Sequence, residues 1–168
     1  LIINFLKSLV KTLLAQHKLI IEKDYYFFQN IYISQIENIC MINHVTKGIK
    51  VSVRTGFDGS YFKNYSLHFS FNYTIIITNQ SKSTVQLKTR HWRVFDSLSS
   101  DIIIDGEGVV GKKPLLKPGD SYKYSSGCLI TSPVGAMRGF YNMVDVNSGK
   151  KFKAYIPTFK LNAPQALN

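Results

Sequence analysis

The sequence predicts an all-β domain, an antiparallel β-sandwich of immunoglobulin-like type. After residue 41, apolar and polar residues alternate with a period of two over long stretches, which is typical of strands with one buried face. About seven such strand candidates are separated by turn signals, and no helical pattern lies between them. A closed β-barrel is the alternative architecture that the same pattern allows.

The clearest strand candidate covers Tyr65–Thr78. One of its faces is apolar or aromatic, and the other carries serine, threonine, asparagine and histidine with Ile76 as the single apolar exception. This alternation indicates a strand with one face against a core. The side chains expected to face that core are Tyr65, Leu67, Phe69, Phe71, Tyr73, Ile75 and Ile77.

A second strand begins after a polar turn, at Val85. Its first apolar residues, Val85 and Leu87, have the opposite parity to Trp92 and Val94 further along. A strand can bury both pairs on one face only if an extra residue shifts the alternation between them. We therefore expect a bulge or a local twist within Lys88–His91.

Three neighbouring residues of that strand, Arg90, His91 and Trp92, allow two interpretations. In the favoured one, Trp92 anchors the core, as a central tryptophan does in many sandwiches, and Arg90 and His91 face outward. In the alternative, the guanidinium, imidazole and indole groups together form a recognition surface or hold a metal ligand.

The remaining strands are predicted from shorter alternating segments between turn residues. The expected strands are Gly48–Arg54, Asp101–Ile104, Ser121–Ser125, Arg138–Asp145 and Lys151–Ile156. The expected turns are Asp58-Gly59-Ser60, Pro118-Gly119-Asp120, Ser132-Pro133 and Asn147-Ser148-Gly149.

Residues 1–40 differ in character from the rest of the chain. Apolar residues at three- and four-residue spacings within 2–21 predict a helix, which one interpretation places on a membrane surface. A secretory signal is disfavoured, because Lys7 and Lys11 interrupt the apolar segment and no small-x-small cleavage site follows. The favoured interpretation is mistranslated upstream sequence, since the segment lacks an initial Met and is rich in residues encoded by A/T-rich DNA. We expect a domain at 41–168 behind a helical or disordered extension.

The net charge of +11 belongs almost entirely to the predicted domain. The chain has 168 residues with 21 Lys+Arg against 10 Asp+Glu, and the first 40 residues hold four lysines and three acidic residues. No aromatic RNA-binding motif accompanies the basic residues, so a solvated cationic surface is favoured over nucleic-acid binding. The charges are dispersed, and their clusters are Lys112 with Lys113, and Lys150 with Lys151 and Lys153.

Composition narrows the class of protein further. A hydrophobic content of 45% with 13% aromatic residues excludes a mainly disordered chain. Two cysteines, Cys40 and Cys128, are too few for a disulfide scaffold, and their scarcity predicts a reducing, cytoplasmic setting. No apolar run approaches the roughly 18 residues that a membrane span needs.

A glycine-rich segment at 106–111 matches the G-x-G-x-x-G pattern of dinucleotide-binding loops. In those proteins the loop opens a helix whose amides bind pyrophosphate. Here Pro114 and Pro118 preclude a packed helix, so a glycine-rich loop between strands is favoured. Anion or partner binding by this loop and the lysines after it remains the alternative. The residues concerned are Gly106, Gly108, Gly111, Lys112 and Lys113.

Residues for metal binding or catalysis are sparse in the predicted domain. His44, His68, His91 and Cys128 have no spacing typical of a metal site, so we predict neither a metal nor a cofactor. Cys128 and the distant His91 are the single thiol–imidazole pair, and free cysteines are most often small buried hydrophobes. The sequence therefore predicts no enzyme.

From Val45 to Asn168 the chain resembles the ApaG family, also called CorD. The matching motifs occur in the family's order and cover the predicted domain. They are VTKGIKVSV at 45–53, NYTIIITNQS at 72–81, VQLKTRHW at 85–92, DGEGVVGKKPLLKPGDSYKYSSGC at 105–128, GAMRGFYNMVD at 135–145 and IPTFKLNAP at 156–164.

The resemblance implies a fibronectin-III-like β-sandwich without established enzymatic activity. It also implies a link to cobalt resistance and magnesium efflux in bacteria. Related domains in eukaryotic F-box proteins and in a protein that interacts with DNA polymerase delta imply protein recognition. Because residues 41–168 contain no membrane span, we expect any effect on ion transport to be indirect.

These inferences lead to a first hypothesis, a non-enzymatic interaction domain that acts through an unidentified protein partner, as a monomer or homodimer. The second is a small-ligand binder, for a phosphate-containing molecule or a divalent cation, that uses the glycine-rich loop. Besides that loop, the candidate interaction surface consists of Arg90, His91, Met137, Arg138 and Phe140.

Overall fold

The computed structural model describes residues 41–164, and this part of the chain consists mainly of antiparallel strands. The interpretations of residues 1–40 fall on positions outside the described residues. The strands are β1 (Ile42–Thr46), β2 (Ile49–Lys63), β3 (Ser66–Asn79), β4 (Val85–Asp96), β5 (Ile102–Glu107), β6 (Leu115–Leu116), β7 (Ser121–Ile130), β8 (Val134–Asp145) and β9 (Lys151–Asn162).

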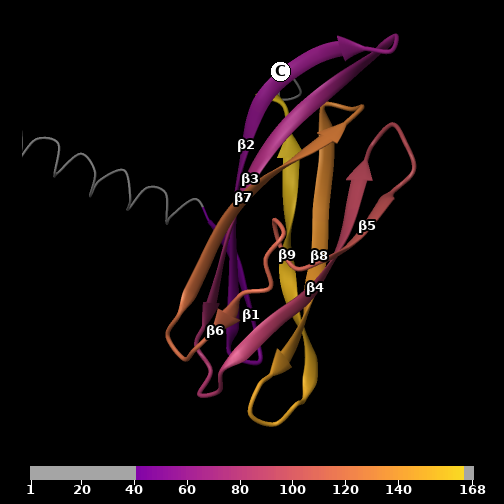
Figure 1. Cartoon of the computed structure of the whole chain (residues 1–168). Helices are drawn as coiled ribbons and strands as arrows, with labels where there is room; N and C mark the ends of the chain where they lie inside the picture. Colours follow the sequence, from indigo (N-terminus) through magenta and orange to yellow (C-terminus); the bar gives the residue numbers. More distant parts are fainter. Residues whose placement is uncertain (1–40, 165–168) are drawn as a thin grey trace, which may run out of the picture. The chain divides into compact units, whose positions relative to one another are not determined.

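The strands form two sheets that face each other across a common core (Figure 1). The first sheet has the order β1-β2-β3-β7. The second has the order β5-β4-β8-β9, with β6 paired to β4 beside β5. All pairings between these strands are antiparallel, and the sheets do not close into one barrel. The predicted β-sandwich is confirmed, and the alternative barrel is wrong.

The core consists of the inward residues of both sheets, as the alternation predicts. Trp92 of β4 is 2% exposed. Its ring lies 5.6 Å from the ring of Tyr73 on β3 and 5.9 Å from that of Phe159 on β9, measured between centroids. Such tilted and edge-on aromatic contacts join the two layers. The prediction that Trp92 anchors the core is confirmed.

The predicted break in the alternation of β4 is also present. The register between β4 and β8 shifts between Leu87 and Thr89, which makes Lys88 the extra residue. Leu87 and Trp92 are both buried as a result, although their parity differs. From Arg90 to Asp96 the strand then alternates regularly, so that odd-numbered positions face solvent.

One predicted turn is wrong. Asp58-Gly59-Ser60 does not end a strand but lies within β2, at a bulge between Phe57 and Gly59 where Gly59 has φ 136°. The chain reverses later, at Asn64 and Tyr65, whose φ values of 50° and 59° are typical of a two-residue hairpin turn. The glycine therefore serves a bulge rather than a turn.

The same hairpin limits the predicted core face of β3. Tyr65 is 98% exposed and Leu67 is 44% exposed, because the tip of the β2–β3 hairpin extends beyond the opposite sheet (Figure 1). From Phe69 onward the expected residues are buried. The shortest strands, β1 and β6, were not predicted, and β2, β7, β8 and β9 extend further than the sequence patterns indicated.

The part of the chain that the structure describes contains no helix with the length and hydropathy needed to cross a membrane. For function, the important feature of the fold is the position of β4 and β8. They are the two central strands of the second sheet, and their inner residues pack on the core while their outer residues face solvent.

Candidate interaction face on the second sheet

The glycine-rich segment folds as a tight hairpin after β5. Val109 and Lys112 form an isolated antiparallel bridge, and between them Val110 and Gly111 have φ values of 47° and 72°. The Val109 side chain is fully buried and fixes the loop to the core. A Cβ atom on Gly108 would lie 2.1 Å from the carbonyl oxygen of Lys112, so this position admits glycine alone.

Three amides of this loop, those of Gly108, Val109 and Lys112, are used inside the protein. The Gly108 amide donates to the Lys88 carbonyl at 2.8 Å, and the Val109 and Lys112 amides donate to each other's carbonyls at 2.8 and 3.0 Å. A phosphate-binding loop instead directs consecutive amides toward its ligand. The arrangement is therefore that of a structural hairpin, and it gives no support to the hypothesis of a small-ligand loop.

Arg90 belongs to this loop rather than to an outer surface. Its register partner on β8 is the fully buried Tyr141, so Arg90 lies on the inner side of the sheet. Its Nη1 atom donates to the carbonyls of Glu107 and Gly108, both at 2.9 Å. The expectation that Arg90 faces outward is wrong: the bulge at Lys88 lies before Arg90, so Arg90 and Trp92 are two apart in a regular strand and share the inner face.

The two lysines after the loop differ in their contacts. Lys113 forms an ion pair with Glu107, and the hydrogen bond and positive charge of Lys113 lower the pKa of that carboxyl group. Lys112 is exposed. The loop thus neutralises one of its own cations.

The outer face of the second sheet has a different character. His91 on β4 and Phe140 on β8 are register partners and stack with ring centroids 4.7 Å apart. The Nδ1 atom of His91 lies 2.7 Å from a carboxylate oxygen of Asp105 on β5. Lys153 on β9 places its ammonium group 4.0 Å from the centroid of the Phe140 ring. Cationic and aromatic groups thus share this surface.

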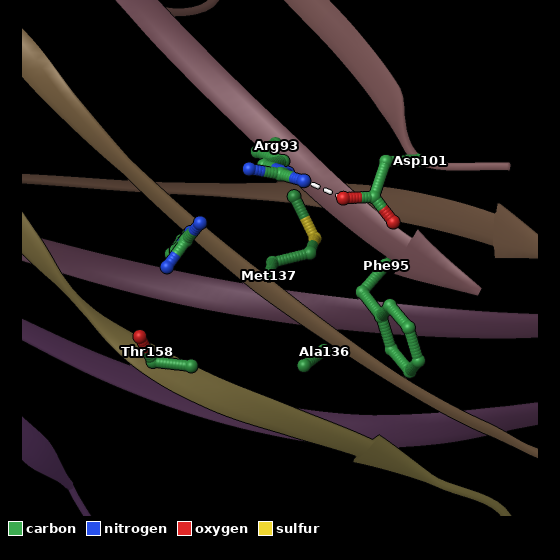
Figure 2. Close-up of a pocket in the computed structure, with 7 residues that line it drawn as sticks. Arg93, Phe95, Asp101, Ala136, Met137 and Thr158 are labelled. Atoms are coloured by element: carbon green, nitrogen blue, oxygen red, sulfur yellow. Dashed lines mark hydrogen bonds and ion pairs between the residues drawn. The ribbon is translucent and has the colours of Figure 1, made fainter. Parts of the chain in front are cut away.

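Next to His91 and Phe140, two arginines lie directly opposite each other. Arg93 of β4 is the register partner of Arg138 of β8, and both are exposed. Figure 2 shows the guanidinium of Arg93 directed to Asp101, with which it forms an ion pair through Nε. Arg138 has no hydrogen-bond or ion-pair partner among residues 41–164.

Two adjoining hollows lie on either side of the arginine pair. One, of about 300 Å³, is bordered by Phe95, Ala136 and Asp101, and the other, of about 400 Å³, by Tyr155, Phe140 and His91. Arg93, Arg138 and Thr158 border both. We call this surface the arginine face, and define it by His91, Arg93, Arg138, Phe140, Tyr155 and Thr158.

Of the predicted surface residues, the structure brings His91, Arg138 and Phe140 together on the arginine face. Contact of Met137 with a partner is expected only if the side chain is exposed; Met137 is 2% exposed and packs in the core, although it borders the hollow beside Asp101. The reason is alternation: Met137 and Arg138 are neighbours in one strand and point to opposite sides. Sequence reasoning missed Arg93 and Tyr155, although Arg93 follows His91 at a two-residue spacing that predicts a shared face.

Cys128 lies away from this face. It is a half-buried residue of β7 in the first sheet, and burial together with the charge of Asp96 raises the pKa of its thiol to about 11. His91 faces solvent on the second sheet, so the two do not form a thiol–imidazole pair. Within residues 41–164, His, Cys, Asp and Glu form no group of three or more that could hold a metal ion.

Comparison with known sequences identifies relatives of the same length as the domain. A sequence model of the ApaG domain matches residues 59–145. The chain is 42% identical over 124 residues to Protein ApaG of Methylocella silvestris, covering 74% of this chain and 95% of the relative. It is 40% identical over 131 residues to Protein ApaG of Beijerinckia indica, covering 76% of this chain and all of the relative.

Comparison with solved structures agrees with these matches. A crystal structure of an ApaA protein from Bordetella pertussis is 36% identical, covers 70% of this chain and 94% of its own, and has a TM-score of 0.61. A second crystal structure, from the same structural genomics consortium, is also 36% identical, covers 70% of this chain and 88% of its own, and has a TM-score of 0.66. The motifs, the sandwich and these relatives together establish that the chain belongs to the ApaG family.

Proposed function

We propose that this ApaG domain is a non-enzymatic protein-interaction module whose contact surface is the arginine face. The observation that carries the proposal is the gathering of arginine and exposed aromatic side chains around two hollows on the outer face of one sheet. Arginine, tyrosine and phenylalanine are enriched at protein interfaces, and arginine and tyrosine are enriched among binding hot spots. Tyr155 is 49% exposed and Phe95 is 48% exposed, so their rings are accessible to a partner.

The chemistry of the described residues favours binding over catalysis. The pair His91–Asp105 has the geometry of a base and its orienting carboxylate, but its ring stacks on Phe140 and no hydroxyl or thiol nucleophile contacts it. The raised thiol pKa of Cys128 leaves it a poor nucleophile. These features support a recognition surface.

We extend the proposal to the biological setting that the family resemblance implies. The domain acts in the cytoplasm, and its link to cobalt resistance and magnesium efflux is indirect, through the protein that binds the arginine face. The partner, rather than this domain, then contacts the ion-transport system.

Affinity purification tests the proposed surface. The full chain, its Tyr155→Ala variant and its Tyr65→Ala variant are tagged and used to capture proteins from the native cell. Both substitutions remove an exposed tyrosine, but Tyr65 lies at the tip of the β2–β3 hairpin, far along the chain from the arginine face. We expect a specific partner to be lost with Tyr155→Ala and kept with Tyr65→Ala.

The opposite pattern, or equal capture by all three proteins, contradicts the proposed surface. Circular dichroism of the three proteins provides the folding control. Cobalt sensitivity of cells that carry Tyr155→Ala tests the biological link separately, because a normal response would reject that link and leave the binding result intact.

A further inference from the structure

The arrangement of Arg93 and Arg138 is unfavourable for the isolated domain. Directly opposed residues of an antiparallel pair have Cβ atoms about 4.5–5.5 Å apart, and like charges at such positions destabilise the sheet. Asp101 pairs with Arg93 through Nε, and no contact of Asp101 with the terminal guanidinium nitrogens is present. The terminal nitrogens of Arg93 and the whole guanidinium of Arg138 therefore present hydrogen-bond donors without a partner among the described residues.

An anion placed between these two guanidinium groups would remove the repulsion. Guanidinium binds carboxylate and phosphate through paired, charge-assisted hydrogen bonds, which are stronger than neutral ones. The Thr158 side chain, which borders both hollows, lies beside the same position and can add a hydroxyl donor. The charge of this site thus specifies an acidic group.

The surroundings specify more than a small anion. The hollow beside Asp101 is bordered by Phe95 and Ala136, and the other by Tyr155 and Phe140, so apolar side chains flank the arginine pair on both sides. An extended peptide places neighbouring side chains on alternate faces, so that residues two apart point the same way. A segment with an acidic residue between apolar ones matches this pattern.

A nucleic acid fits the arginine pair and its surroundings less well than such a peptide does. Asp101 and Asp105 stand along the β5 side of the face and would repel a continuous phosphate backbone. We propose that Arg93 and Arg138 bind the carboxylate of an acidic residue in an extended segment of the partner protein, while apolar residues next to it enter the two hollows. This proposal rests on the proposed function and names the chemistry of the partner segment.

Nuclear magnetic resonance titration of the full chain tests it. The probe is a short, acetylated and amidated peptide of alternating glutamate and leucine, and the comparison peptide has glutamine in place of glutamate. We expect the glutamate peptide to shift the Nε–Hε signals of Arg93 and the amides of β4 and β8. Loss of one charge-assisted contact in Arg138→Gln should weaken binding about 10- to 100-fold.

The matched control is Lys123→Gln, which removes one positive charge from the exposed side of β7 in the first sheet. We expect it to change the affinity by less than about twofold, since rim charges away from a contact contribute little. Equal affinity of both peptides, equal affinity of Arg138→Gln and the wild type, or no shift at millimolar peptide would overturn the proposal. Inorganic phosphate that shifts the same signals while the peptide does not would also overturn it, in favour of a small-anion site.

Failure of the acidic-peptide proposal can be distinguished from failure of the proposed function. If the peptide result is negative while Tyr155→Ala still abolishes capture of a cellular partner, the arginine face remains the interface and the acidic peptide is rejected. If capture does not depend on Tyr155, the interface itself is rejected.

Discussion

The glycine-rich loop, which the sequence nominated for binding, and the arginine face, which it nominated only in part, differ in how they use their polar groups. In the loop, the amides of Gly108, Val109 and Lys112 donate to backbone carbonyls, and Glu107 neutralises Lys113. On the arginine face, Arg138 has no partner among the described residues. Unpaired donors on this face are what the proposed binding role requires.

The comparison also explains why the more recognisable motif is the less informative one. Each glycine of the loop has a local structural reason: Gly106 faces the guanidinium of Arg90, Gly108 lies against a carbonyl, and Gly111 has a positive φ. Backbone requirements alone account for the pattern of glycines. The loop should therefore respond to substitution through stability, and the arginine face through binding.

The largest effect is expected for Gly108→Ala. The φ of 57° is unfavourable for alanine, and the new Cβ would lie 2.1 Å from the carbonyl oxygen of Lys112, so the hairpin must move. We expect the free energy of unfolding to fall by about 3 kcal/mol, as strain and overpacking add. Urea denaturation followed by tryptophan fluorescence measures it, since Trp92 is the sole tryptophan of the chain.

Gly111→Ala is the control for this prediction. Its φ of 72° carries the same backbone penalty, but a Cβ there meets no atom within 4 Å. We expect a loss of about 1 kcal/mol. Equal losses for the two variants would show that the close approach at Gly108 is not what the loop requires. A folded Gly108→Ala protein that fails to capture the partner would return the loop to the binding surface.

A smaller effect is expected for Asp96, a buried carboxylate at the end of β4 that lies outside both regions. Asp96, which is 2% exposed, accepts hydrogen bonds from the amide and hydroxyl of Thr131 at 2.6 and 2.8 Å and from the Leu98 amide at 3.2 Å. Burial raises its pKa, but the hydrogen bonds to its charged form outweigh burial and lower the pKa below the usual value. We expect Asp96→Asn to cost about 2 kcal/mol at neutral pH.

The sign of the pH dependence follows from the lowered pKa. The stabilisation by Asp96 is complete above the pKa of an unfolded aspartate, about 4, and is lost as the pH falls through the lower folded value. The difference in stability between wild type and Asp96→Asn should therefore shrink in acid. Asp105→Asn, beside the arginine face, should cost less than about 1 kcal/mol, because the side chain of Asp105 is 71% exposed. A constant difference between wild type and Asp96→Asn across this pH range would contradict the role of the charged form.

The sequence patterns predicted most of the fold because each inference depended on neighbouring residues. Alternation located the long strands, and the mismatch between Leu87 and Trp92 predicted the bulge that register confirms at Lys88. The same local reasoning failed at Gly59, where a glycine typical of turns serves a bulge. Local reasoning also failed for Arg90, because the side of the sheet on which Arg90 lies depends on which residue within Lys88–His91 forms the bulge.

The arginine face could be predicted only in part, since it requires the pairing of strands far apart in sequence. His91, Arg138 and Phe140 were named from their residue types. That Arg93 lies opposite Arg138 depends on the register between β4 and β8, and that Tyr155 borders the same hollow depends on the register between β8 and β9. Composition shows that the domain has a net positive charge, but only the strand register shows that Arg93 and Arg138 lie opposite each other.

The smallest predicted effect is also the one that most directly separates the two regions. Arg138→Gln removes a positive charge that faces Arg93 across the sheet and that has no partner among residues 41–164. Because opposed like charges destabilise a strand pair, we expect the free energy of unfolding to rise by about 0.2–0.5 kcal/mol. Denaturation at low salt measures it best, since added salt screens exposed charges.

The matched substitution in the loop should have the opposite sign. Arg90→Gln removes the donors that hold the carbonyls of Glu107 and Gly108, and we expect a loss of about 1–2 kcal/mol. If Arg138→Gln destabilised the domain as Arg90→Gln does, Arg138 would be a structural residue and the contrast between loop and face would fail. A more stable domain that binds its partner less well would instead show that Arg138 is retained at a cost to folding, which is the property expected of a recognition residue.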